Sequence, residues 1–79
     1  MSTYVATFHT HLSALMTSRK LSSLGVAARM MPVPRKLSAS CGTCVCYTAP
    51  DPCLDSMDAD VEGVYEITGT EQYALLMEG

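Results

Sequence analysis

The sequence of 79 residues lacks any apolar run near the roughly 20 residues needed to cross a bilayer, so we expect no membrane span. Charged residues are also few, at 16%, whereas 48% of residues are apolar, and this balance argues against general disorder. The length allows one small domain over residues 1–79, with a core over about 4–68 and a C-terminal tail over 69–79. A core of this size gives marginal stability, so metals, disulfides or partners often add to it.

Each half of the chain lacks one sign of charge. All five Lys and Arg residues and both histidines precede residue 41, and all eight Asp and Glu residues follow residue 50. A basic half can mark a nucleic-acid surface, but five cations without interleaved aromatics are a poor footprint, so we expect no nucleic-acid partner. The acids of residues 51–62 are expected to form a solvated helix face or, alternatively, a partner site.

The first 40 residues lack acids and carry Arg and Ser, as organellar transit peptides do. They lack the basic n-region and the long apolar run of a secretory signal. Residues 4–8 and 26–33 nevertheless resemble strands of a fold, and removing 40 residues would leave too little chain for a core. The sequence therefore favours an unprocessed cytoplasmic chain whose thiols stay reduced.

Residues 10–24 have the pattern of one helix between two strands. Thr10 is a suitable N-cap and Gly25 is the expected left-handed stop, while residues 4–8 and 26–31 have strand character. Small side chains in the helical stripe would let the helix lie close to a sheet. The stripe comprises Ala14, Thr17, Ser18, Leu21 and Leu24.

The second half of the chain predicts two strands and a second helix. Residues 43–49 have high β character and alternate in the direction of their side chains, with Thr43, Val45 and Tyr47 on one face and Cys44, Cys46 and Thr48 on the other. Asp51 and Pro52 suit the start of a short helix, whose buried residues would be Leu54, Met57 and Val61. Residues 64–68 form the last predicted strand.

The predicted order is strand, helix, strand, strand, helix, strand. With right-handed crossovers this order gives an α+β, ferredoxin-like split βαβ sandwich of four antiparallel strands with two helices on one face. Gly69 and Thr70 are expected to cap a final helical turn in the tail. If the protein is a scaffold, exposed residues of this tail would dock on a partner, namely Tyr73, Leu76 and Met77.

Four cysteines lie within thirteen residues, at Cys41, Cys44, Cys46 and Cys53. A zinc or Fe–S site that uses all four is one interpretation, but zinc sites commonly use two CxxC pairs and only one is present. Strand geometry would also place Cys44 and Cys46 about 7 Å apart. The histidines at positions 9 and 11 are more typical of strand ends than of metal ligands. We therefore expect no metal and no other cofactor.

Reactive thiols fit the spacing better. Cys41 follows a polar loop in which Arg35 and Lys36 are within reach, and a nearby cation favours the thiolate. Cys53 would lie in the first turn of the second helix, where the helix dipole also favours a thiolate. Cys44 and Cys46 fit the buried face of a strand, where cysteine packs as a small hydrophobic residue.

Four stretches, 8–11 (FHTH), 24–26 (LGV), 32–35 (PVPR) and 38–42 (SASCG), together resemble the selenium/sulfur carrier-like family. The resemblance covers about residues 4–68. It implies a ferredoxin-like domain in which one loop cysteine holds sulfur or selenium as a persulfide or perselenide. It also implies supporting roles around this thiol: Gly42 allows close backbone approach, Arg35 stabilises the anionic chalcogen, and Ser38 and Ser40 donate hydrogen bonds.

We therefore expect a non-enzymatic carrier that uses Cys41, with a cysteine desulfurase or another sulfur or selenium donor and an acceptor protein as partners. The extra cysteines are not part of the family motif, and Cys44 could act as a resolving thiol that attacks a persulfide and releases sulfide. A small thiol–disulfide switch of Cys41 and Cys44 is the alternative, followed by the zinc or Fe–S module. No Ser-His-Asp arrangement, phosphate loop or paired-carboxylate motif suggests conventional catalysis.

Overall fold

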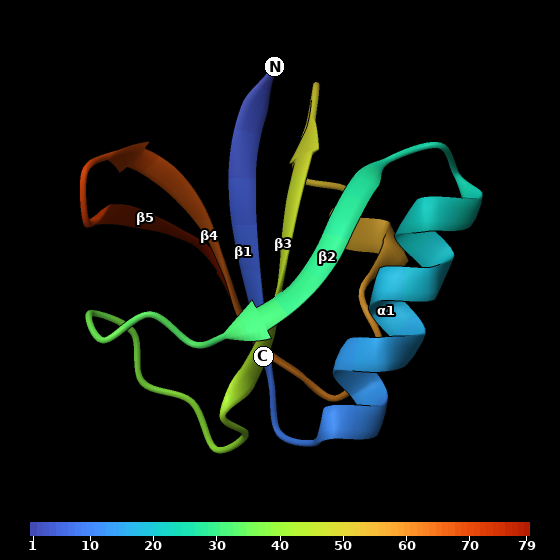
Figure 1. Ribbon diagram of the computed structural model, residues 1–79, viewed down its shortest axis with the longest axis horizontal. Helices are drawn as coiled ribbons and strands as arrows, with labels where there is room; N and C mark the ends of the chain where they lie inside the picture. The colour runs from blue at the N-terminus through green and yellow to red at the C-terminus, as the bar shows by residue number, and fades with distance from the viewer.

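Five antiparallel strands form one sheet, and a single α-helix covers one face of it (Figure 1). The computed structural model describes all residues, 1–79. The strand order is β2-β3-β1-β4-β5, so that β1 lies in the centre. The elements are β1 (Ser2–Phe8), α1 (His11–Ser23), β2 (Ala27–Pro32), β3 (Thr43–Ala49), the short 3₁₀ helix η1 (Leu54–Ser56), β4 (Val61–Gly69) and β5 (Gln72–Glu78).

Helix α1 forms where the sequence predicts it. The Thr10 side chain accepts a hydrogen bond from the Ser13 N–H at 3.3 Å, which caps the first turn. Gly25, with φ at +83°, turns the chain into β2. The helix buries Ser13, Ala14, Thr17 and Leu21 and leaves Leu12 and Met16 exposed. Since most of the buried side chains are small, the helix packs closely on β1, β2 and β3.

The core lies between α1 and the sheet. Alternate residues of the neighbouring strands β1 and β3 point towards the helix, and Phe8 and Tyr47 are the largest side chains that are fully buried there. The predicted faces of β3 are confirmed, because Val45 and Tyr47 belong to this core. Cys44 and Cys46 belong to the opposite face, where they pair across the strands with Thr7 and Val5.

The predicted second helix is wrong. The Asp51 side chain accepts a hydrogen bond from the Cys53 N–H at 2.8 Å, but this closes a turn in which Cys53 takes a left-handed φ of 53°. Only the three residues of η1 follow, and Leu54 is exposed. Val61 opens β4, because a β-branched side chain gains more in the sheet than in a one-turn helix.

The predicted helical tail is also wrong, because residues 72–78 form β5 and pair along β4. Glu71 takes a φ of 52° in the tight turn between the two strands. An isolated helix of this length is marginal, whereas a strand pairs with the free backbone groups at the edge of β4. The α+β class is therefore confirmed, but five strands and one helix replace the predicted four strands and two helices.

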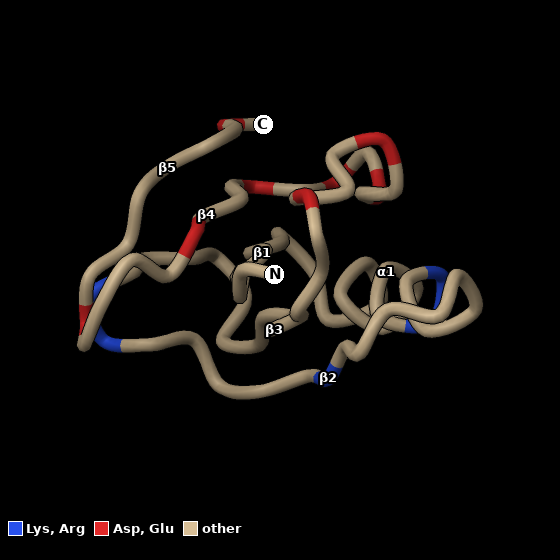
Figure 2. Tube along the Cα trace, turned by 90° about the horizontal axis from the view of Figure 1, so that it is seen from above, with Lys and Arg blue, Asp and Glu red and all other residues tan.

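The sheet face turned away from α1 is flanked by two projecting segments. Figures 1 and 2 both show the loop 33–42 and the β4–β5 hairpin on the side opposite the helix. Three residues on this face, Val5, Thr7 and Cys44, are fully buried although no helix covers them. The loop that contains Cys41 therefore borders the sheet face opposite α1.

Two of the three leucines of α1, Leu21 and Leu12, test the core. Leu21 is fully buried, so Leu21→Ala is expected to lower the free energy of unfolding by about 2–5 kcal/mol. Leu12 is 62% exposed, so Leu12→Ala, the matched control, is expected to change it by no more than about 0.5 kcal/mol. Urea unfolding followed by circular dichroism measures both values, and equal losses would contradict the packing described.

Candidate functional site

Cys41 lies near the end of the loop 33–42, separated from β3 by Gly42 alone, and its side chain is partly exposed. The Val33 N–H donates a hydrogen bond to the Gly42 carbonyl oxygen at 3.0 Å and closes the base of the loop. A second backbone hydrogen bond, from the Leu37 N–H to the Pro34 carbonyl oxygen, closes a turn inside it. A side chain added at Gly42 would meet no atom within 4 Å, so the space beside Cys41 is open on that side.

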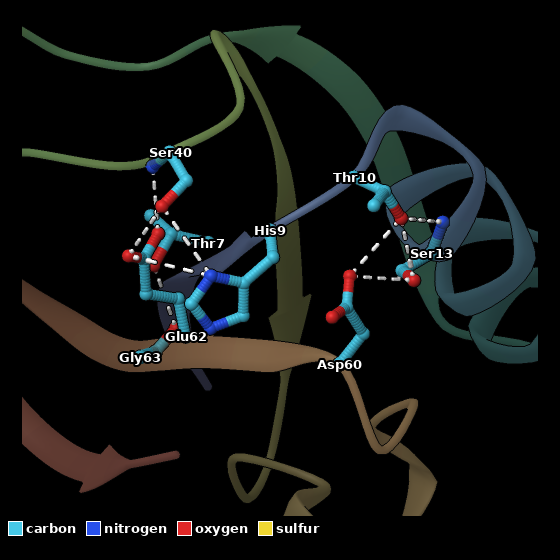
Figure 3. Close-up of polar contacts among 8 residues, drawn as sticks. All are labelled: Thr7, His9, Thr10, Ser13, Ser40, Asp60, Glu62 and Gly63. Atoms are coloured by element: carbon cyan, nitrogen blue, oxygen red, sulfur yellow. Dashed lines mark hydrogen bonds and ion pairs between the residues drawn. The ribbon is translucent and has the colours of Figure 1, made fainter.

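Ser40, the residue before Cys41, is bound to β4. Its N–H donates to Glu62 Oε1 at 2.9 Å, and its hydroxyl donates to Glu62 Oε2 at 3.0 Å (Figure 3). His9, which follows β1, places Nδ1 at 3.3 Å from the Ser40 hydroxyl and 3.7 Å from Glu62 Oε2. These three residues are called the Ser40 cluster below, and they join the Cys41 loop to the ends of two central strands.

The hydrogen bonds of the Ser40 cluster favour the ionised form of Glu62. The hydrogen bond from the Ser40 N–H is the main cause that lowers the pKa of the Glu62 carboxyl; burial opposes it, and the Ser40 hydroxyl and His9 add to it. The sequence predicts that Glu62 lies on a solvated helix face and that His9 is an ordinary residue at the end of a strand. The structure corrects the interpretation of Glu62, which lies in β4, and confirms that His9 follows a strand. It adds that both residues contact Ser40, from which they lie 22 and 31 positions away in the chain.

Asp60, two residues before Glu62, binds the start of α1 in a similar way. Its Oδ2 accepts hydrogen bonds from the Thr10 hydroxyl at 3.0 Å and the Ser13 hydroxyl at 2.9 Å (Figure 3). Burial raises the pKa of Asp60, but the hydrogen bonds from Ser13 and Thr10, together with His9, outweigh it, and the pKa lies below its ordinary value. The start of β4 therefore holds both α1 and the Cys41 loop through carboxylates.

The other residues proposed around Cys41 make fewer contacts. Arg35 and Ser38 are both exposed. The structure shows no ion pair for Arg35 and no side-chain hydrogen bond for Ser38. Figure 2 shows the cations of this loop on the side of the molecule away from α1. Their roles beside a bound sulfur or selenium atom stay predictions.

Of the remaining cysteines, Cys46 and Cys53 are partly exposed, as Cys41 is, and only Cys44 is buried. Cys44 is fully buried, and burial, reinforced by the neighbouring Cys46, raises its pKa to about 11 despite the opposing charge of Arg29. Burial, followed by the charge of Asp51, also raises the pKa of Cys53. The expectation of a thiolate at Cys53 is therefore wrong, because no α-helix begins there. All four cysteines are free thiols.

The four cysteines do not converge. Cys41 ends the loop, Cys44 and Cys46 belong to β3, and Cys53 precedes η1. No three His, Cys, Asp or Glu side chains form a group that could hold a metal ion. The four cysteines thus do not form a common ligand group in this structure.

The fold and the site describe a small α+β protein in which Cys41 is partly exposed on a loop held by hydrogen bonds. The chain belongs to the family described as "Putative Se/S carrier protein-like", whose model matches residues 3–66 and so includes the Cys41 loop and the Ser40 cluster. Over 50 residues it is 30% identical to the uncharacterized protein YtiA of Escherichia coli (strain K12). This match covers 63% of the chain and 59% of YtiA.

No solved structure gives a significant match to this chain. The one helix, α1, is too short and too polar to cross a membrane.

The lowered pKa values of Asp60 and Glu62 predict acid sensitivity. A carboxyl whose pKa is lower in the folded protein stabilises it fully above the ordinary values of 3.8 and 4.5, and this contribution is lost as the pH falls through the folded values. The double variant Asp60→Asn/Glu62→Gln should therefore be less stable than the wild type at pH 7 and approach it near pH 2. Urea midpoints measured across this range check the prediction, and a constant difference would contradict it.

Cys44 is expected to be the slowest thiol to react with iodoacetamide at pH 8. Raising a thiol pKa from 9.0 to about 11 lowers its thiolate fraction about 100-fold at this pH, and burial also blocks the reagent. Timed alkylation followed by mass spectrometry of the cysteine peptides measures the rate at each site. In urea-unfolded protein, the control, the Cys44 rate should rise to that of the other cysteines; equal rates in the folded protein would contradict the burial of Cys44.

Proposed function

We propose that this protein carries sulfur or selenium on Cys41, as a persulfide or perselenide, between a donor and an acceptor protein. The observation that carries the proposal is the place of Cys41 within the matched family region, where it is partly exposed on a tethered loop. Cys44, the next thiol, is buried. A carrier thiol must be reached by two partner proteins in turn, and Cys41 meets this requirement better than Cys44.

The chemistry proceeds by exchange at sulfur. The Cys41 thiolate attacks the outer sulfur of a donor persulfide, the donor S–S bond breaks, and the donor leaves as a thiolate while Cys41 becomes Cys–S–SH. An acceptor thiolate then attacks the outer sulfur and releases the Cys41 thiolate, so atoms and electrons balance without an added oxidant. Selenium follows the same exchange from a donor perselenide.

Features of the loop support this exchange. The open space beside Gly42 leaves room for the attacking or departing group next to Cys41. In the proposal, Arg35 places a positive charge near the terminal chalcogen and Ser38 donates a hydrogen bond to it. A cysteine desulfurase, which forms a persulfide from cysteine, is the proposed donor, and the reduced thiol pool of the cytoplasm is the proposed setting.

The burial of Cys44 supports a carrier over a thiol–disulfide switch. A resolving thiol must attack as a thiolate, and a pKa of about 11 leaves little thiolate at neutral pH. A persulfide on Cys41 would therefore be protected from attack by Cys44. Cys44 lies only three residues from Cys41, but a buried, protonated Cys44 would not attack the persulfide, and the sulfur would stay bound to Cys41.

Incubation with a cysteine desulfurase and cysteine is expected to add one sulfur atom to the Cys41 peptide of the intact chain. Mass spectrometry without reductant locates the added mass. Cys41→Ser should lose the adduct, whereas the control Cys46→Ser should keep it.

An unloaded wild type, or an adduct that persists at another cysteine in Cys41→Ser, would overturn the carrier proposal. A Cys41–Cys44 disulfide formed in place of the adduct, and lost in Cys44→Ser, would instead support the redox switch.

A further inference from the structure

We propose that Glu62 is a positioning residue that holds Cys41 in place through Ser40, with His9 completing the contact. The inference deepens the proposed function and rests on it, because it assigns a purpose to groups that lie outside the loop of Cys41. Neither Glu62 nor His9 carries the sulfur or selenium atom. Both act on Cys41 through Ser40, the residue before it in the chain.

Both sequence neighbours of Cys41, Ser40 and Gly42, are held by hydrogen bonds. On one side, both hydrogen-bond donors of Ser40 bind the Glu62 carboxylate, at 2.9 and 3.0 Å. On the other side, the Gly42 carbonyl oxygen accepts from the Val33 N–H at 3.0 Å. Because the two bonds to Glu62 involve both the backbone and the side chain of Ser40, they restrict its orientation as well as its position. The peptide unit that leads into Cys41 is thereby set.

The contacts of Glu62 are directed at this loop and not at the core. The side chain of His9 is 46% exposed and that of Glu62 is 28% exposed, and neither belongs to the hydrophobic cluster. Removing the carboxylate therefore leaves the packed layer between α1 and the sheet intact. The side chain of Glu62 contacts Ser40 of this exposed loop and His9 after β1, so its loss should affect where the loop lies more than whether the chain folds.

Asp60 provides a matched control within the same strand region. Like Glu62, it is a carboxylate with a lowered pKa that accepts two hydrogen bonds. Its donors, however, are the hydroxyl groups of Thr10 and Ser13 at the start of α1. A general effect of losing a charged, hydrogen-bonded acid near β4 would appear in both variants. An effect on Cys41 should appear only when Glu62 is changed.

If Glu62 positions Cys41, losing its carboxylate should slow the transfer of sulfur to Cys41 and leave partner binding unchanged. Displacing a reacting group by about 1 Å can slow a reaction by about 100-fold, whereas the surface that a partner contacts stays largely the same. Glu62→Ala is therefore expected to lower kcat for sulfur transfer from a cysteine desulfurase to Cys41 by about 10- to 100-fold with KM nearly unchanged. Glu62→Gln keeps one acceptor oxygen for Ser40 and should recover part of the rate.

The experiment measures two quantities on the full chain. Sulfur loading of Cys41 gives kcat and KM, and amide hydrogen exchange of residues 38–43 reports the tether without any transfer. Glu62→Ala should speed exchange in this segment about tenfold, and Ser40→Ala, which keeps the N–H bond, should have a smaller effect. The double variant Glu62→Ala/Ser40→Ala should be no worse than Glu62→Ala alone, and Asp60→Asn should match the wild type in both measurements.

Unchanged exchange in Glu62→Ala overturns the inference, as does a rise in KM with kcat unchanged or an equal effect in Asp60→Asn. If Glu62→Ala does not fold, Glu62→Gln is judged by the same two measurements. If the wild type takes up no sulfur, the proposed function fails while exchange still decides whether Glu62 holds the loop. The two failures are therefore distinguishable.

Discussion

The pairing of β1 with β3 and β4 is the constraint on which the rest of the structure depends. Strand β1 is buried on both faces over Tyr4–Phe8, with no residue there more than 5% exposed, so its neighbours on each side are held in register. Phe8 pairs with Val61, which brings the end of β1 beside the start of β4. His9 and Glu62 meet for this reason, and the Cys41 loop is bound at the point where they meet.

The sheet also separates four thiols that lie close together in the sequence. In strand β3 the Cys44 side chain lies on the sheet face opposite α1, where burial favours the protonated thiol. Cys41 lies three residues before Cys44, outside the strand, and is partly exposed. Four cysteines that resemble a metal site in sequence are therefore spread over different elements: Cys44 is buried, whereas Cys41, Cys46 and Cys53 are partly exposed. This separation is what makes a single-cysteine carrier chemically reasonable.

Much of the fold was predictable because its signals are local. The cap at Thr10, the left-handed Gly25 and the alternation of residues 43–49 are each decided within a few residues, and the structure agrees with all three. The errors fall where local preference is weak. Asp51 and Pro52 favour a helix start equally well whether or not a helix follows, and residues 72–78 choose a strand because the edge of β4 is available to pair with them.

The sequence by itself determined that Cys41 lies in a loop, since the Pro, Ser and Gly residues around it disfavour a regular element there, and this loop lies within the matched family region. It also determined the helix, four of the strands and the direction of Cys44. Only the tertiary structure decided which acids hold that loop, and that Cys46 stays partly exposed while Cys44 on the same face is buried. Hydrogen bonds such as those from Ser40 to Glu62 join residues 22 positions apart. No local pattern encodes such a distance; the register of the central strands does.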